Sequence, residues 1–501
     1  MLFNSFHFLL FFPAVVLAYF IVPAKLRYLW LLAASYYFYM SWNAKYAVLI
    51  AFSTFVTWAS GLLLGICKKQ GIKHTAGKWV VALSFLINLG ILAFFKYFDF
   101  ALGNVNALLS RMGFAAIERR FDLVLPVGIS FYTFQALSYT MDVYREEIEP
   151  EKNIAKYALF VSFFPQLVAG PIERSKNLLR QIDAIDRVSI RTLCDYDRIA
   201  SGLRIMLWGY FQKMVIADRI AILVNTVFDS WYFYGTVELV LAAAAFSIQI
   251  YCDFNSYSTI AVGAAKVMGF TLMENFDTPY FARSIQEFWR RWHISLSTWF
   301  KDYLYIPLGG SRCSKLRRYR NLLVTFLVSG LWHGASWHFV VWGGIHGALQ
   351  VAAAETRGLR DRLYERFHTK RASFSFQLGQ VASTFVLTTF AWIFFRAESL
   401  SQAFSYIERI FTKPDWWALS DGTVYRLGLK RVEMNILLSS LWVLFAASLV
   451  KYKNHETLDV FLTKQCAWFR WLAVAGLFAY VFLFGIYGPG FDASQFIYFQ
   501  F

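Results

Sequence analysis

The sequence predicts an all-α protein that crosses a membrane many times. Hydrophobic residues make up 58% of the chain and charged residues only 16%, whereas soluble domains contain about 45–50% apolar and about 25% charged residues. Many apolar stretches approach or exceed the roughly 18 residues with which a helix crosses a bilayer. We therefore expect about 11–13 transmembrane or re-entrant helices, because backbone groups in lipid must be hydrogen-bonded within the protein.

Eight apolar stretches are clear candidates for spans. In chain order they are residues 6–22, 46–66, 79–98, 123–139, 239–251, 376–395, 435–450 and 468–487. Four less regular apolar stretches complete the series: residues 28–40, 155–170, 199–228 and 321–349. Several are short or interrupted by glycine and proline, which is tolerated at membrane depth only where the backbone is buried in protein or lines a cavity.

The charges that flank these stretches predict how the chain is oriented. No Lys or Arg precedes the first stretch and no clear cleavage site follows it, so we expect a retained span rather than a signal peptide. Lys25 and Arg27 follow it directly, which places the N-terminus outside the cytoplasm by the positive-inside rule. Counting back from the basic loops, the last span leaves the cytoplasm, so the C-terminus is expected outside as well.

The net charge of +17 points to membrane lipids rather than to nucleic acid. The basic residues cluster in loops between the apolar stretches, at 68–69, 312–320 and 357–371. Cytoplasmic-loop bias and attraction to anionic headgroups explain such clusters. Because no soluble basic domain is present, we expect no nucleic-acid partner. The five cysteines include no C-x-x-C pair and predict neither a disulfide framework nor a metal site.

We expect residues 1–501 to form a single integral domain, since the sequence has no long linker, low-complexity tract or internal repeat. Residues 173–198 are polar and basic with interspersed apolar residues, which is typical of a helix lying along the cytoplasmic interface. Residues 496–501 form a C-terminal aromatic run that contains Tyr498. The Tyr498 phenol can be acylated, and an aryl ester is activated because phenoxide is a good leaving group. The alternative is that Tyr498 anchors the tail in an interfacial aromatic belt.

The residues with chemical potential concentrate between Phe288 and Gly347. His333 lies in an apolar stretch, and Gly330 and Gly334 leave room beside it for another group to approach closely. A neutral imidazole there can accept a proton from a hydroxyl or thiol nucleophile. The alternative is that His333 only bridges helices through hydrogen bonds.

His293 is the second candidate. It follows Arg290 and Arg291, which can grip a phosphate or carboxylate, although a basic helix end at the interface would look the same. His338 and His346 follow His333, but their spacing matches no familiar zinc pattern and no nearby Cys or carboxylate completes a set. We therefore predict no metal site.

Together with these histidine segments, five further motifs give the chain a resemblance to a known family. They are LPVGISFYTF at 125–134, FPQLVAGPI at 164–172, YCDFNSYS at 251–258, MENF at 273–276 and FFRA at 394–397. The chain resembles the membrane-bound O-acyltransferases, in particular the bacterial branch with alginate and peptidoglycan O-acetylation membrane subunits and teichoic-acid D-alanyl transferases. The resemblance covers nearly the whole chain in order, and residues 288–310 are most similar to the alginate-type subunits.

The resemblance implies roles for the candidate residues. His333 matches the family's catalytic histidine and His293 its second characteristic histidine. The family's fold is a helical ring around a central tunnel, and its aromatic C-terminal motif resembles an acyl shuttle, which is the role implied for Tyr498. Acetyl-CoA is then the expected cytoplasmic donor, with Arg290, Arg291 or the 312–320 loop as contacts for its phosphates.

The same resemblance implies a bacterial inner-membrane protein that works with an extracytoplasmic acetyltransferase partner on a polysaccharide such as alginate. Peptidoglycan or another exopolysaccharide is the alternative acceptor. A transporter of a lipid-linked sugar is the alternative from another class. It predicts paired charges inside the membrane and repeat symmetry, and the sequence reveals neither. A non-catalytic scaffold would leave His333 unexplained.

Overall fold

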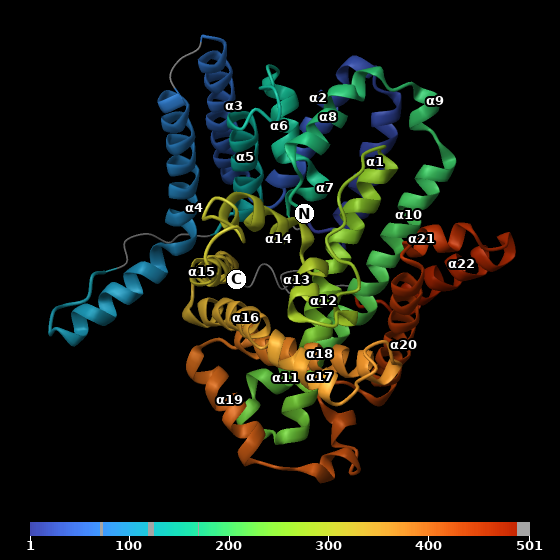
Figure 1. Ribbon diagram of the computed structural model, residues 1–501. Coiled ribbons are helices and arrows are strands. Elements are labelled where there is room, and N and C mark those ends of the chain that lie inside the picture. Colours follow the sequence, from blue (N-terminus) through green and yellow to red (C-terminus); the bar gives the residue numbers. More distant parts are fainter. Residues whose placement is uncertain (71–73, 119–124, 169, 488–501) are drawn as a thin grey trace. The chain divides into compact units, whose positions relative to one another are not determined.

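All regular structure in the described part of the chain is helical, which confirms the predicted all-α fold (Figure 1). The computed structural model describes residues 1–70, 74–118, 125–168 and 170–487. The C-terminal motif 496–501, with Tyr498, lies outside the described residues. The first two residues of the span expected at 123–139 also lie outside them, and helix α5 (Ile129–Tyr144) accounts for most of the rest.

The helices gather into two compact units. The first comprises Met1–Met206 and Ser258–Met273, and the second comprises Leu207–Tyr257 and the chain from Glu274 onward. Helices α10 (Tyr196–Tyr210) and α12 (Thr236–Val267) each contribute residues to both units.

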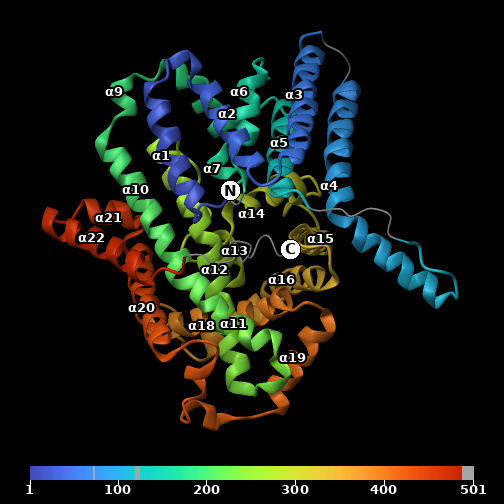
Figure 2. The same ribbon diagram turned by 180° about the vertical axis from the view of Figure 1, so that it is seen from behind.

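The first unit is built on helix α3, which packs against α4, α5 and α6. Both ribbon views show α3, α4 and α5 side by side (Figures 1 and 2). Buried polar bonds join these helices: Ser53 Oγ donates to Asn88 Oδ1 at 2.5 Å, and Tyr157 Oη donates to Thr57 Oγ1 at 2.8 Å. Such bonds hold helices together where lipid supplies no hydrophobic driving force. Besides α5, the helices of this unit run as follows: α1 (Phe6–Ile21), α2 (Arg27–Met40), α3 (Ala47–Lys69), α4 (His74–Arg111), α6 (Ile154–Ser162), α7 (Phe164–Leu167), α8 (Ser175–Ala184) and α9 (Ile190–Leu193).

The second unit carries both candidate histidines. Its most extensive helix pair is the hairpin of α15 (Lys315–His333) and α16 (Trp337–Glu355), against which α13 and α18 pack. Its other α-helices are α11 (Asp218–Asp229), α13 (Ile285–Arg291), α14 (Ile294–Phe300), α17 (Arg357–Arg366), α18 (Phe374–Arg396), α19 (Leu400–Thr412), α20 (Arg431–Asn454), α21 (Leu458–Thr463) and α22 (Ala467–Phe484). Two π-helical segments, Phe211–Ala217 and Lys301–Tyr305, interrupt the regular turns.

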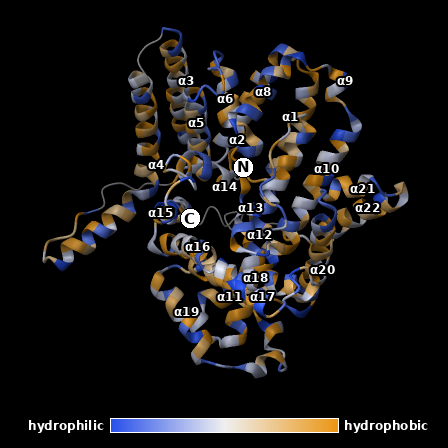
Figure 3. Cartoon of the chain, in the orientation of Figure 1, coloured by the Kyte–Doolittle hydropathy of each residue, from blue (hydrophilic) through white to orange (hydrophobic). Residues whose placement is uncertain are grey.

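Six of the described helices are long and apolar enough to cross a membrane. They are Ala44–Lys69, Thr75–Arg111, Thr236–Val267, Phe374–Arg396, Arg431–Asn454 and Ala467–Phe484. Each contains one of the predicted apolar stretches almost entirely, and Figure 3 shows hydrophobic residues along their length. The polytopic membrane character is therefore confirmed. The central tunnel that the resemblance implies stays a prediction.

Of the four less regular apolar stretches, 28–40 forms one helix, α2, and the other three are divided. The 321–349 stretch contains the end of α15, the turn at residues 334–336 and most of α16. The 199–228 stretch is divided among α10, a π-helical segment and α11. The turn between α15 and α16 begins at Gly334, one of the glycines that interrupt the stretch.

The 173–198 segment contains two short helices, α8 and α9, rather than one. The apolar side chains of α8, Leu178, Leu179 and Ile182, are buried, and the helix packs against α5 and α6. Glu173, just before it, accepts hydrogen bonds from the Met273 amide and the Asn177 side chain. This side of α8 therefore faces protein, and the cytoplasmic placement of the segment stays a prediction.

Candidate active site

His333 is the last residue of α15 and is buried among aromatic rings. Its ring centroid lies 5.0 Å from those of Trp332 and Trp342 and 5.5 Å from that of Phe395. All three neighbours meet it edge-on, an arrangement in which ring edges and faces attract one another. The helix end and the packed rings together fix the position of the imidazole.

The glycines beside His333 serve the packing of α15 on α16. A Cβ atom on Gly330 would lie 2.2 Å from the backbone oxygen of Phe339, and one on Gly334 would lie 2.1 Å from the Phe339 ring. No side chain fits at such distances. The close approach that the sequence predicts is therefore real, and the group that approaches is α16.

The structure places His293 beside His333, although the two are far apart in the sequence. Their ring centroids are 6.4 Å apart and their planes are inclined at 63°. His293 caps α14 with φ of 43°, a left-handed conformation that residues other than glycine seldom adopt. The Phe254 ring packs against it at 4.5 Å. Two histidines from different helices thus meet in one buried aromatic setting.

Asn275 holds His293 and the start of α14. Its Oδ1 lies 3.2 Å from His293 Nδ1 and accepts from Ser295 through the backbone amide at 3.2 Å and the hydroxyl at 2.8 Å. Its backbone oxygen accepts from the Ile294 amide at 2.9 Å. The 273–276 motif was recognised in the sequence, but Asn275 was assigned no role. Its partners are residues 293–295, too far along the chain for a local pattern to reveal.

Burial sets the charge of His293. The residue lies outside the candidate spans, between two seven-residue helices. Desolvation lowers the pKa of His293 to about 3, so the ring is neutral near pH 7. A neutral ring carries no charge to attract phosphates, and it has one N–H donor and one lone-pair acceptor.

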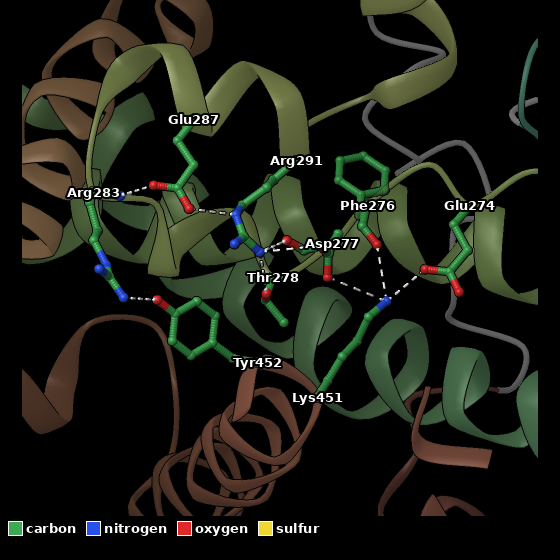
Figure 4. A network of polar contacts seen from close by, with 9 residues as sticks. All are labelled: Glu274, Phe276, Asp277, Thr278, Arg283, Glu287, Arg291, Lys451 and Tyr452. Atoms are coloured by element: carbon green, nitrogen blue, oxygen red, sulfur yellow. Dashed lines mark hydrogen bonds and ion pairs between the residues drawn. The ribbon is translucent and has the colours of Figure 1, made fainter. Parts of the chain in front are cut away.

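Arg291 is engaged by carboxylates (Figure 4). Its guanidinium pairs with Glu287 Oε1 at 3.0 Å and with Asp277 Oδ2 at 3.1 Å. It also donates to the Asp277 carbonyl and the Thr278 hydroxyl, and it lies over the Tyr452 ring at 5.4 Å. These partners occupy the fork that would otherwise grip a donor phosphate.

Lys451, at the end of α20, extends the same network. Its ammonium group pairs with Glu274 at 2.8 Å, lies 3.9 Å from Asp277 Oδ1 and donates to the backbone oxygen of Phe276 at 3.4 Å (Figure 4). The network therefore holds the residues on both sides of Asn275. Arg290, by contrast, is exposed and forms no hydrogen bond or ion pair within the described residues.

The remaining histidines of this region have other bonds. His338 Nδ1 lies 3.1 Å from the Phe394 carbonyl, and His346 Nδ1 accepts from the Trp289 indole at 3.2 Å. Within the ranges that the structure describes, no group of three or more His, Cys, Asp or Glu residues is placed to hold a metal ion.

Sequence reasoning missed a buried charge cluster. Lys213, in the π-helical segment, pairs with Asp253 of α12 at 2.5 Å and with Asp218 of α11 at 2.8 Å, and these three side chains are 2–3% exposed. The sequence revealed no such pair, whereas the structure shows one buried, with Asp253 inside the apolar helix Thr236–Val267. Asp253 sits in an apolar helix within the YCDFNSYS motif, which was the available signal.

Comparisons with known proteins point to one family. Residues 147–397 match the family model of MBOAT, the membrane-bound O-acyltransferase family. The probable alginate O-acetylase of Azotobacter vinelandii is 38% identical over 84% of this chain and 80% of its own length. The peptidoglycan O-acetyltransferase of Helicobacter pylori is 36% identical over 79% of this chain and 77% of its own. The teichoic acid D-alanyltransferase of Bacillus subtilis is 27% identical over 46% of this chain and 59% of its own.

Proposed function

Because this chain belongs to the membrane-bound O-acyltransferase family, we propose that it moves acetyl groups from a cytoplasmic donor, acetyl-CoA, across the membrane for O-acetylation of an extracytoplasmic polysaccharide. The chain is an O-acyltransferase and an integral membrane protein. The acceptor, the donor and the residues that perform the transfer are the proposed parts.

The observation that carries the proposal is the meeting of His293 and His333, with ring centroids 6.4 Å apart in a buried aromatic setting. His333 is the general base. It takes the proton from the acyl-accepting hydroxyl as that oxygen attacks the thioester carbon. The carbon–sulfur bond of acetyl-CoA breaks, an oxygen–carbon bond forms, and the proton passes from His333 to the departing CoA thiolate.

The donor enters from the cytoplasmic side. Lys451 and Lys453 lie in the last turn of α20, which the positive-inside rule places in the cytoplasm. The Lys451 network that supports His293 is then at the cytoplasmic end of the unit. Arg290 is exposed and is the better candidate of the two arginines for a CoA phosphate, since carboxylates engage Arg291. Both termini are extracytoplasmic, in a bacterial inner membrane.

Tyr498 accepts the acetyl group on the outer side. It lies outside the described residues, so this step rests on the sequence: a phenyl ester is small, uncharged and activated. A separate extracytoplasmic acetyltransferase attacks that ester with its own nucleophile and passes the acetyl group to a polysaccharide hydroxyl. The charged CoA moiety remains in the cytoplasm, since charged groups are costly to bury in a bilayer.

Alginate is the acceptor that the most similar of the reported relatives favours, at 38% identity. Peptidoglycan is the second candidate, because the Helicobacter pylori relative is 36% identical over most of both chains. The Lys213 cluster is a buried charge pair, which is one of the features expected of a sugar transporter. Its ammonium group is paired with both Asp218 and Asp253, which suits a structural role.

The proposal is tested by complementation. The chain is expressed in an alginate-producing host that lacks its own membrane acetylation subunit, and acetate bound to alginate and to peptidoglycan is measured separately. Acetate on alginate supports the first acceptor and acetate on peptidoglycan the second. Purified protein is then given acetyl-labelled acetyl-CoA. Release of free CoA together with acid-stable label on the C-terminal peptide supports the Tyr498 step, and protein that neither consumes acetyl-CoA nor becomes labelled argues against the whole proposal.

A further inference from the structure

The hydrogen bonds of Asn275 determine which nitrogen of His293 carries the proton. The Asn275 side chain meets Ser295 N, Ser295 Oγ and His293 Nδ1 through one atom, Oδ1. A backbone amide can only donate. The side-chain atom that faces Ser295 N must therefore be the oxygen, and a flipped amide would bring two donors together.

The same oxygen can only accept from His293. Nδ1 lies 3.2 Å away from it and therefore carries the hydrogen. In a neutral imidazole the other nitrogen then holds the lone pair. We infer that Asn275 is a positioning residue for acyl transfer, which fixes His293 as the Nδ1–H tautomer and presents Nε2 as a hydrogen-bond or proton acceptor.

Asn275 can enforce this because its backbone and both neighbouring residues are held in place. Its backbone oxygen accepts from Ile294 N at 2.9 Å, which ties it to the residue that follows His293. Lys451 holds the neighbouring Glu274 and Phe276, and Arg291 holds Asp277 (Figure 4). The left-handed backbone of His293, with φ of 43°, is maintained by these contacts rather than by its own preference.

The inference rests on the proposed function and narrows the role of His293 within it. With Nε2 as acceptor, His293 receives a hydrogen bond from a thiol or hydroxyl and cannot donate one to the thioester carbonyl. The opposite tautomer would place a hydrogen at Nε2, which could then donate to the thioester carbonyl but could not accept. In this inference Asn275 acts through the His293 ring that it orients, as hydrogen-bond partners of functional histidines do.

The tautomer can be tested without any activity. Full-length protein in lipid is labelled with ¹⁵N only at histidine Nδ1, and its solid-state NMR spectrum is compared with that of His293→Gln. The signal missing from the variant belongs to His293, and a protonated, pyrrole-type Nδ1 is expected. An unprotonated, pyridine-type Nδ1 would overturn the inference, whatever reaction the protein performs.

The catalytic consequence is tested with a matched pair of variants. Asn275→Ala removes the acceptor for Nδ1–H, and we expect kcat for acetyl-CoA consumption to fall about 10–100-fold with KM nearly unchanged. Ser295→Ala removes the hydroxyl that shares the same oxygen but leaves the His293 bond, and it should retain most activity. Equal losses in the two variants would mean that the local fold, not the tautomer, was disturbed, and would overturn the inference.

Asn275→Asp tests whether the residue acts through its hydrogen bond to His293 or only through its packing. The carboxylate still accepts from Nδ1–H, so turnover should be retained at high pH. Its charge favours the imidazolium form and raises the pKa of His293, so the acidic limb of the kcat profile should move to higher pH. Loss of activity at all pH values, in protein that elutes as wild type does, would overturn the inference. If wild-type protein consumes no acetyl-CoA, the proposed function fails, and the NMR result alone decides the tautomer.

Discussion

Two histidines that share one setting are held in it by different means. His333 is fixed at the end of α15 by the rings of Trp332, Trp342 and Phe395. His293 is fixed by Asn275, through a bond that also determines its tautomer. The contact between His293 Nδ1 and Asn275 Oδ1 leaves Nε2 as the acceptor of that ring. In the proposed mechanism His333 is therefore the base and His293 the acceptor.

The assignment of His333 predicts the effect of removing its ring. We expect His333→Ala to lower polymer-bound acetate by about 10²–10⁴-fold, which is the usual contribution of a general base. The matched control is His338→Gln, because glutamine can still donate to the Phe394 carbonyl that His338 contacts. Membrane levels of both variants are measured by immunoblot. Near-normal acetylation by His333→Ala would remove it from the mechanism.

The neighbouring arginines predict opposite outcomes. Arg290→Ala should raise KM for acetyl-CoA about tenfold, in the range of one charge-assisted hydrogen bond, and leave the melting temperature unchanged. Arg291→Ala should lower the melting temperature, because Asp277 and Glu287 each lose their ion pair with its guanidinium. KM for acetyl-CoA, with CoA as a competing ligand, and the melting temperature are both measured on purified protein. A rise in KM confined to Arg291→Ala would reverse the two roles.

At the scale of the helices, the sequence located the spans but not their extent. The stretch expected at 239–251 lies in the N-terminal half of α12, which runs from Thr236 to Val267. Asp253 ends the apolar run in the sequence, but in the fold it is paired with Lys213 and the helix continues past it. Hydropathy counts such a residue as a break, because the partner that makes its burial possible lies on another segment.

The α15–α16 contact predicts a steric effect. Gly330→Ala places a methyl group against the Phe339 carbonyl, where a Cβ would lie 2.2 Å from the oxygen. We expect α15 to shift, stability to fall by about 1–3 kcal/mol, and activity to fall with it because His333 ends this helix. Gly476→Ala in α22 is the control, since its Cβ would meet nothing within 4 Å. Thermal melting and acetyl-CoA turnover are compared, and equal tolerance of both substitutions would contradict the close packing.

The Lys213 cluster predicts a larger effect on stability. Lys213→Met leaves Asp218 and Asp253 buried without their cation, and breaking a buried pair typically costs about 3–5 kcal/mol. Lys315→Met is the control, because its pair with Glu355 is exposed to solvent and such pairs contribute little to stability. Denaturation in a mild detergent measures both. A small loss for Lys213→Met would indicate that the cluster is hydrated rather than sealed.

At the scale of the whole molecule, composition and apolar runs predicted the membrane fold, and two motifs predicted the histidines. The bond between Asn275 and His293 could not be predicted, since it joins the irregular segment after α12 to the start of α14. The ion pairs of Arg291 with Asp277 and Glu287 could not be predicted either. Two adjacent arginines give the same sequence pattern whether or not carboxylates pair with them. Local pattern identifies which residues can react, and only the fold decides which of them have partners.

The proposed transfer across the membrane requires the Tyr498 phenol, and Tyr498→Phe tests it. The substitution removes one oxygen and keeps the ring, so packing in an aromatic belt should barely change. If the phenol carries the acetyl group, polymer-bound acetate in cells should fall as far as in His333→Ala, while membrane levels stay normal. Deleting residues 496–501 cannot separate these readings, because it removes anchor and nucleophile together. Full acetylation by Tyr498→Phe would end the shuttle hypothesis, since Phe496, Phe499 and Phe501 would then be holding the tail as an anchor alone.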